Sequence, residues 1–251
     1  KLQLAGIAMT KRRKREASDT SSSSSTISES HLSVRFSGLV HAAMSNVNVS
    51  DDFLMDMVRK LQSSDAYASV DAWLVSLTLT SEVVGVKSES IAPHMCIRMG
   101  HALISCLLQF IRSVKDGVNS EDTTTRSQQE FACVLLLSAT HKLFLNGESN
   151  ESKKHTGKKE EDESKRTVKT IVKCIQWTAS SQVRNQGLAL LSHLASTAST
   201  AVLGCLVPVF SFVGKDLATA SEDNYTFNVV RKILQVVVPA LPSEHMHAVM
   251  N

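Results

Sequence analysis

The residues best suited to hold a metal ion are histidines and cysteines, and the chain has nine of the former and five of the latter. Four of them share one stretch at spacings of two, five and five residues: His94, Cys96, His101 and Cys106. A tetrahedral site needs its ligands around one point, which these spacings along a helix do not provide. His245-Met-His247 is no recognised site either. The sequence therefore predicts no metal site, and core packing or helix-end solvation accounts for these side chains.

The sequence also lacks common catalytic and cofactor-binding motifs. The sequence contains no Gly-x-x-x-x-Gly-Lys-Ser/Thr loop, Gly-x-Gly-x-x-Gly turn, Gly-x-Ser-x-Gly elbow or His-Glu-x-x-His helix. Its carboxylates gather in polar segments, and no pair lies in an apolar pattern where burial could tune one as an acid and the other as a base. We expect a non-enzymatic chain with no catalytic residues, no cofactor and no small-molecule substrate.

Charge could still support nucleic-acid binding, but only locally, because the net charge is +3 over 251 residues. The densest cluster is Lys11, Arg12, Arg13, Lys14 and Arg15, which a serine-rich tract follows. Low apolar content predicts a flexible basic and serine-rich linker, with a short N-terminal segment, over 1–30. The five cations suit a nuclear-localisation signal or an RNA-phosphate contact; the alternative is a solvated charge run. The serines beside them are hypothetical phosphorylation sites.

Apolar residues at helical spacing predict the elements that follow, and we assign 31–147 to helical repeats. A helix over 31–46 precedes one that Ser50 or Asp51 caps, and a third follows Asp65. Longer helices are expected over 91–114, with Pro93 in the first turn, and over 127–146, with Gly147 as a stop. The capped helix should bury one stripe of apolar residues: Phe53, Leu54, Met57, Val58 and Leu61.

The segment 148–166 is the clearest linker in the chain. It has six basic and six acidic side chains and no aliphatic residue, so we expect it to be disordered. Its lysines could touch a phosphate backbone, but the acidic run 160–163 lies beside them, which favours a solvated insertion between two helices.

Helical repeats resume over 167–251, with helices expected at 167–179, 181–196, 200–213 and 224–238. The last of these carries a polar ridge at helical spacing on an otherwise apolar helix: Asn228, Arg231, Lys232 and Gln235. Only this narrow ridge should meet water. Arg231 and Lys232 are therefore candidate contacts for RNA or a partner; the alternative is that they solvate the face.

No segment alternates as a strand would, and successive helix pairs recur every 35 to 45 residues or so, a period typical of helical solenoids. The fold class we predict is all-α, a HEAT-like α-solenoid of stacked antiparallel helix pairs, in a fragment of a longer chain. Five cysteines lie singly in apolar patterns, which indicates reduced thiols in the cytosol or nucleus. The apolar run 201–213 is shorter than the roughly 20 residues of a membrane-spanning helix, so no membrane partner is expected.

Within 182–241 the sequence resembles a known family. The resemblance rests on four pieces in order: Leu191-Ser-His-Leu-Ala195, Pro208-Val-Phe-Ser-Phe-Val-Gly214, Asp223-Asn-Tyr-Thr-Phe227 and Val236-Val-Val-Pro-Ala-Leu241. They are similar to the large HEAT-repeat proteins of the small-subunit processome, known as HEAT repeat-containing protein 1 or U3 small nucleolar RNA-associated protein 10.

The resemblance implies a nucleolar, non-enzymatic scaffold in small-subunit ribosome biogenesis. Implied partners are other processome proteins, the U3 snoRNP and the 5′ external transcribed spacer of pre-rRNA, with a role in 18S rRNA maturation coupled to pre-rRNA transcription. The family supplies no short RNA-binding motif to carry over. Two rival hypotheses are a HEAT-type nuclear transport or regulatory adaptor, and a helical accessory region of an enzyme whose catalytic motifs lie elsewhere in a longer chain.

Overall fold

A computed structural model describes residues 49–63, 70–116, 123–148, 158–209 and 224–240. By compactness the chain divides into a unit over Lys1–Leu39 and a unit over Val40–Asn251, and every described residue belongs to the second. The basic run 11–15, the serine tract and the helix expected over 31–46 lie outside the described residues. So do the final residues from 241 onward.

All the regular structure in the described ranges is helical, which confirms the predicted all-α class. Proline in the first turn of α4 needs no amide partner there, and Ser50 caps α2 by accepting a hydrogen bond from the Phe53 amide at 3.3 Å. The helices and their bounds are α2 (Asp51–Leu61), α3 (Val70–Lys87), α4 (Pro93–Asp116), α5 (Thr123–Glu148), α6 (Lys158–Trp177), α7 (Ser181–Thr197), α8 (Ser199–Leu203) and α10 (Asn224–Val237), followed by a 3-10 turn over Val238–Ala240.

Consecutive helices form antiparallel pairs. The first turns of α4 meet the last turns of α5, because the closest neighbours of Gly100 and Gly147 are Phe144 and Ile97 respectively. Helices α6 and α7 pair in the same way, with Gly187 lying against Ile175. Each pair is thus a helical hairpin with one apolar seam, the unit of a helical repeat.

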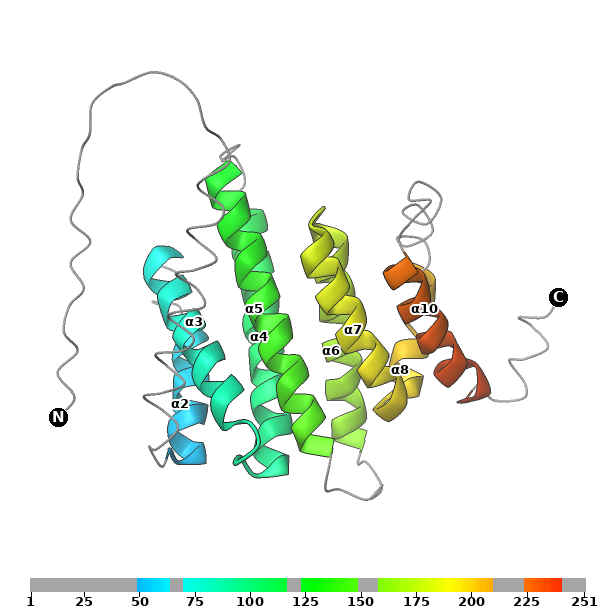
Figure 1. The fold of residues 1–251 in the computed structure, drawn as a ribbon, viewed down its shortest axis with the longest axis horizontal. Helices are drawn as coiled ribbons and strands as arrows, with labels where there is room; N and C mark the ends of the chain where they lie inside the picture. Colours follow the sequence, from blue (N-terminus) through cyan, green and yellow to red (C-terminus); the bar gives the residue numbers. More distant parts are fainter. Residues whose placement is uncertain (1–48, 64–69, 117–122, 149–157, 210–223, 241–251) are drawn as a thin grey trace. The chain divides into compact units, whose positions relative to one another are not determined.

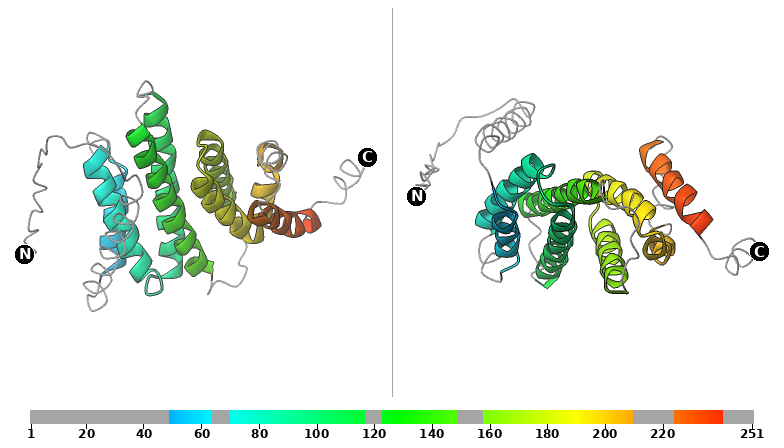
Figure 2. Two further views of the ribbon diagram at one scale, coloured as in Figure 1. Left: turned by 45° about the horizontal axis from the view of Figure 1, so that its top comes forward. Right: turned by 90° about the horizontal axis from the view of Figure 1, so that it is seen from below.

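The pairs stack so that equivalent helices run side by side. The Ala92 amide donates to the Asp51 carboxylate at 3.3 Å, and the Gln62 side chain donates to the Ala102 carbonyl at 2.7 Å, so α2 and α4 run parallel. Helices α4 and α6 pack next, as do α3 with α5, α5 with α7 and α7 with α10. The result is two layers, α2–α4–α6–α8 and α3–α5–α7–α10 (Figures 1 and 2). This arrangement of stacked pairs is that of an α-solenoid.

Glycines allow the closest approaches between paired helices. A methyl group at Gly100 would lie 2.5 Å from the buried ring of Phe144, and one at Gly187 would lie 2.6 Å from Ile175. Gly147 was expected to stop its helix, and α5 does end one residue later at Glu148, but a methyl group at Gly147 would meet Ile97 at 2.7 Å. Its small size serves packing against the start of α4, so the sequence prediction gave the wrong reason for this glycine.

The buried faces differ in detail from the predicted stripes. On α2, Leu54, Val58 and Leu61 are buried as expected, but Phe53 is 54% exposed and Met55 is buried in its place. The position of the neighbouring helices, α3 and α4, decides which side of the stripe is covered. The stacking of Trp73 on Phe110, with ring centroids 4.8 Å apart, completes this part of the core.

The segment expected to be a disordered linker is helical from Lys158 onward, while 149–157 lies outside the described residues. Lysine and glutamate are good helix formers, and Glu161 pairs with Lys165 one turn later at 2.7 Å. The prediction of disorder from charged composition was therefore wrong for 158–166. This segment has no apolar face of its own, but it forms one continuous helix with the residues of α6 that do.

The helix expected over 200–213 is broken. Helix α8 ends at Leu203, a turn covers Gly204 and Cys205, and helical geometry resumes over 206–209. Pro208 explains the position of the break, because its ring would clash with the carbonyl of Gly204 in a continuous helix.

Among the described helices, α4 alone is long and apolar enough to cross a membrane by length and composition. More than half of its most apolar window is buried inside the helical stack. The core helix of a layered all-α fold has the same properties.

Candidate interaction surfaces

The structure gives the four side chains of the 94–106 stretch different surroundings. His94 is exposed, Cys96 and Cys106 are buried, and the Nδ1 of His101 lies 2.9 Å from the hydroxyl of Thr167 on α6. In the described ranges no three histidine, cysteine or carboxylate side chains gather in a way that could hold a metal ion. His245 and His247 lie outside these ranges.

The thiols are placed for packing and not for nucleophilic chemistry. None of the five forms a disulfide and all are buried, which agrees with their apolar sequence context. Burial, with a contribution from Asp51, raises the pKa of Cys96 to about 11, and burial also raises the pKa of Cys205. A hydrogen bond with Cys174, together with burial, holds the pKa of Cys133 well above its usual value. Such thiols stay protonated near neutral pH, whereas a nucleophilic cysteine needs the thiolate.

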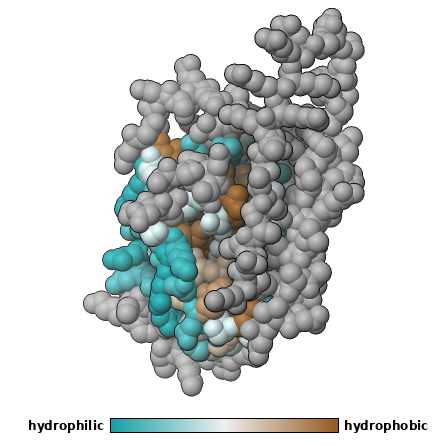
Figure 3. All heavy atoms as spheres, turned by 90° about the vertical axis from the view of Figure 1, so that its left-hand side faces the viewer, coloured by the Kyte–Doolittle hydropathy of each residue, from teal (hydrophilic) through white to brown (hydrophobic). Residues whose placement is uncertain are grey.

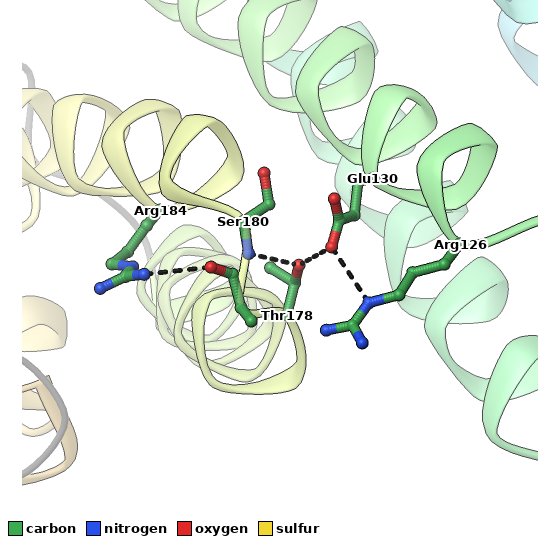
Figure 4. A network of polar contacts seen from close by, with 6 residues as sticks. Arg126, Glu130, Thr178, Ser180 and Arg184 are labelled. Carbon is green, nitrogen blue, oxygen red and sulfur yellow. Dashed lines mark hydrogen bonds and ion pairs between the residues drawn. The ribbon is translucent and has the colours of Figure 1, made fainter. Parts of the chain in front are cut away.

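The clearest polar network joins α5 to the corner between α6 and α7 (Figure 4). The hydroxyl of Thr178 donates to the Glu130 carboxylate at 3.0 Å and accepts from the Ser180 amide at 3.0 Å. Arg126 contacts the same carboxylate at 3.4 Å, and Arg184 donates to the Ala179 carbonyl at 3.1 Å.

Each contact in this network has a structural consequence. Thr178 orders the start of α7 through the Ser180 amide, and Glu130 ties that corner to the preceding helix pair. The thiol that interacts with the Glu130 charge is that of Cys133, which is buried and whose pKa is raised, so it is no nucleophile for this carboxylate to assist. It fixes the register between neighbouring repeats.

Helix α10 exposes more than the predicted ridge. Asn228, Arg231, Lys232 and Gln235 are all exposed, as expected. Tyr225 and Phe227 are also 47% and 54% exposed, so the prediction of a narrow ridge was wrong. The helix packs on α7 and α8, and the side away from them carries both aromatic rings and the two cations. Arg231 and Lys232 are therefore accessible to a partner.

Exposed large apolar side chains occur on other helices too. The layer of α3 and α5 exposes Val75, Leu79, Phe131 and Leu145. Seen from the α2 and α3 side, apolar surface lies directly beside hydrophilic surface on the described helices (Figure 3). Singly exposed apolar side chains are common on folded proteins, so these four do not mark a binding site by themselves.

One set of exposed cations was missed in the sequence. Arg166, Lys169 and Lys173 lie on one face of α6, and all three are exposed. Their spacing of three and four residues was the available signal. On sequence grounds, however, Arg166 was assigned to a linker, and the two lysines were not singled out. Lys11, Arg12, Arg13, Lys14 and Arg15 lie outside the described residues, so their contacts remain a sequence prediction.

Comparison with known proteins supports the resemblance seen in the sequence. The chain is 24% identical to HEAT repeat-containing protein 1 of Danio rerio over 149 residues, which are 59% of this chain and 7% of that protein. It is 42% identical to U3 small nucleolar RNA-associated protein 10 of Mycosarcoma maydis over 72 residues, 29% of this chain and 3% of that protein. For the protein of the same name from Schizosaccharomyces pombe the identity is 34% over 74 residues, 30% of this chain and 4% of that protein.

These matches cover less than a tenth of each relative's length. No protein-family model matches the chain, and no solved structure matches it. The described helices are stacked helical repeats, and part of the chain is similar in sequence to short stretches of HEAT repeat-containing protein 1 and U3 small nucleolar RNA-associated protein 10.

Proposed function

We propose that this chain is part of a non-enzymatic helical-repeat scaffold that acts in small-subunit ribosome biogenesis. The observation that carries the proposal is the similarity to proteins named for association with U3 small nucleolar RNA, together with the stacked helix pairs. A scaffold needs exposed surface for its partners, and several helices expose large side chains. It needs no reactive group, and burial raises the pKa of Cys96 and Cys205 so that these thiols stay protonated.

The partners we propose are other small-subunit processome proteins, the U3 snoRNP and pre-rRNA in the 5′ external transcribed spacer. The exposed face of α10 supports a protein or RNA contact, because it combines Tyr225 and Phe227 with Arg231 and Lys232. Aromatic and arginine side chains are enriched where proteins bind one another, and both also contact nucleic acids. The expected location is the nucleolus, within the nucleus.

Depletion of the protein that carries this chain tests the function. If the scaffold supports small-subunit assembly, the 18S rRNA precursors should fail to mature while 28S precursors are processed normally. Re-expression of the intact protein should restore 18S maturation. Unchanged 18S maturation after depletion would contradict the proposed role, and a nucleocytoplasmic pool without pre-ribosomal particles would favour a transport adaptor.

A further inference from the structure

The outward face of α6 carries a row of cations that the proposed contacts do not use. Arg166, Lys169 and Lys173 are exposed and lie at spacings of three and four residues, so they occupy one face of the helix. At 1.5 Å per residue they extend over about 10 Å along the axis. We call these three residues the α6 cationic stripe.

One acidic residue shares the face of the stripe: Asp162 is exposed and lies four residues before Arg166. From Ser164 to the end of α6 at Trp177 the sequence has no carboxylate, so the acidic charge of this helix lies before the stripe and not within it. Glu161, earlier in the helix, pairs with Lys165, which is not part of the stripe. Within the described ranges, the three stripe residues form no ion pair.

The helix dipole does not account for the position of these cations. A dipole favours basic residues in the last turn of a helix, and the last turn of α6 has none. The stripe instead occupies the middle turns, where the dipole contributes little to helix stability.

The neighbouring helix extends the positive surface. Helix α4 packs against α6, with His101 touching Thr167 at their contact. Arg98 and Arg112 are exposed on α4, which has no acidic residue before Asp116. Between Ser164 and Trp177 on α6, and before Asp116 on α4, the charged residues are therefore all basic, although exposed carboxylates occupy positions 161–163 at the start of α6.

The same surface lacks the features of a protein interface. The exposed large apolar side chains of the described residues lie on other elements, and none is on α4 or α6. Protein interfaces depend on a few apolar or aromatic residues that become buried at the centre of the contact. A row of exposed cations without such a centre suits a polyanion backbone, for which contacts with Lys and Arg supply most of the affinity.

We propose that the α6 cationic stripe binds the phosphate backbone of RNA. This proposal rests on the proposed function, because that function is the reason for choosing RNA as the polyanion. It adds a second surface for RNA contact, separate from Arg231 and Lys232. Contacts to phosphates position a chain without reading its sequence, so binding should depend on salt and hardly on base identity.

The test measures binding of the full chain to a fluorescein-labelled, unstructured single-stranded RNA by fluorescence anisotropy across a range of salt concentrations. The stripe variant replaces three cations together: Arg166→Gln, Lys169→Gln and Lys173→Gln. If each cation contacts one phosphate, the slope of log affinity against log salt should fall by about 2, and affinity at 0.1 M salt should fall by about 10- to 100-fold.

A matched control removes three exposed cations from α2 and α5, so that net charge changes equally: Arg59→Gln, Lys60→Gln and Lys142→Gln. The control should keep the salt slope of the unchanged protein. Circular dichroism and thermal unfolding should show that both triple variants fold, since all six side chains are exposed. A second RNA of different base composition should bind within about threefold of the first.

Three outcomes would overturn the proposal. The stripe variant could bind RNA like the unchanged protein, or both triple variants could lose the same affinity, which would make net charge the cause. Third, poly-glutamate could displace the labelled RNA as effectively as unlabelled RNA of equal charge does. That result would assign the stripe to an acidic protein partner. RNA binding by the stripe with normal 18S maturation after depletion would contradict the proposed function alone.

Discussion

Substitution of Gly100 by alanine tests the close packing between α4 and α5. The new methyl carbon would lie 2.5, 2.9 and 3.1 Å from three atoms of the Phe144 ring. That ring is only 4% exposed and also packs edge-on against His101, at a centroid distance of 5.2 Å, so it has little freedom to move.

Two opposing effects set the size of the change. Overpacking a well-filled core costs about 1–3 kcal/mol. Replacing glycine by alanine inside a helix stabilises it by about 1 kcal/mol. The net expectation is a destabilisation of up to about 2 kcal/mol, and for a chain of this size each kcal/mol lowers the unfolding temperature by about 2–4 °C.

Gly85→Ala is the matched control, because its methyl group would meet the flexible end of Lys142, at 3.1 Å from Nζ. Lys142 is exposed and can move away, so only the helix-propensity gain should remain, up to about 1 kcal/mol. The two variants should therefore shift the unfolding temperature in opposite directions, as measured by far-UV circular dichroism.

A double-mutant cycle then assigns the effect to the ring. Adding Phe144→Leu should cost less in the Gly100→Ala background than in the unchanged protein, because the smaller side chain relieves the clash. If Gly100→Ala proved at least as stable as Gly85→Ala, or if the two substitutions at 100 and 144 were additive, the described packing of α4 on α5 would be wrong.

Three further predictions concern the other packed positions. Burial raises the pKa of Cys96 from an ordinary value near 9.0 to about 11, so its contribution to stability is complete below pH 9 and is lost as pH rises through 11. Cys96→Ala should flatten the fall in unfolding free energy over that window, and an unchanged slope would contradict this. Glu130→Ala should cost about 1–2 kcal/mol in urea unfolding by removing the acceptor for Thr178, whereas Glu130→Gln keeps an acceptor and should cost less; equal losses would contradict the role of this hydrogen bond. Ser50→Ala should cost about 1 kcal/mol through loss of the α2 cap, and Ser50→Asp should restore most of it.

Local signals in the sequence predicted the helices well. Ser50 and Pro93 mark helix starts through backbone chemistry that involves only neighbouring residues, and both predictions are confirmed. The apolar stripes predicted the core in outline. On α2, however, Met55 is buried and Phe53 is exposed, because the packing of adjacent helices decides which flank of the stripe is covered.

Features that depend on contacts between helices were harder to predict. Gly147 looks like a helix stop in the sequence, and only the approach of Ile97 shows why it is small. The hydrogen bond from Thr178 to Glu130 joins residues 48 positions apart, a pairing that spacing alone does not indicate. The candidate surface on α10 was found by its polar spacing, but the exposure of Phe227 depends on which neighbours cover that helix.

The central claim, a scaffold in small-subunit ribosome assembly, is tested most directly by purifying the tagged, full-length protein that carries this chain from sucrose-gradient fractions. The RNAs and proteins that copurify can then be quantified. The proposed function predicts sedimentation with large pre-ribosomal particles and strong enrichment of U3 small nucleolar RNA and processome proteins. Recovery only in light fractions, with U3 small nucleolar RNA at background, would contradict it.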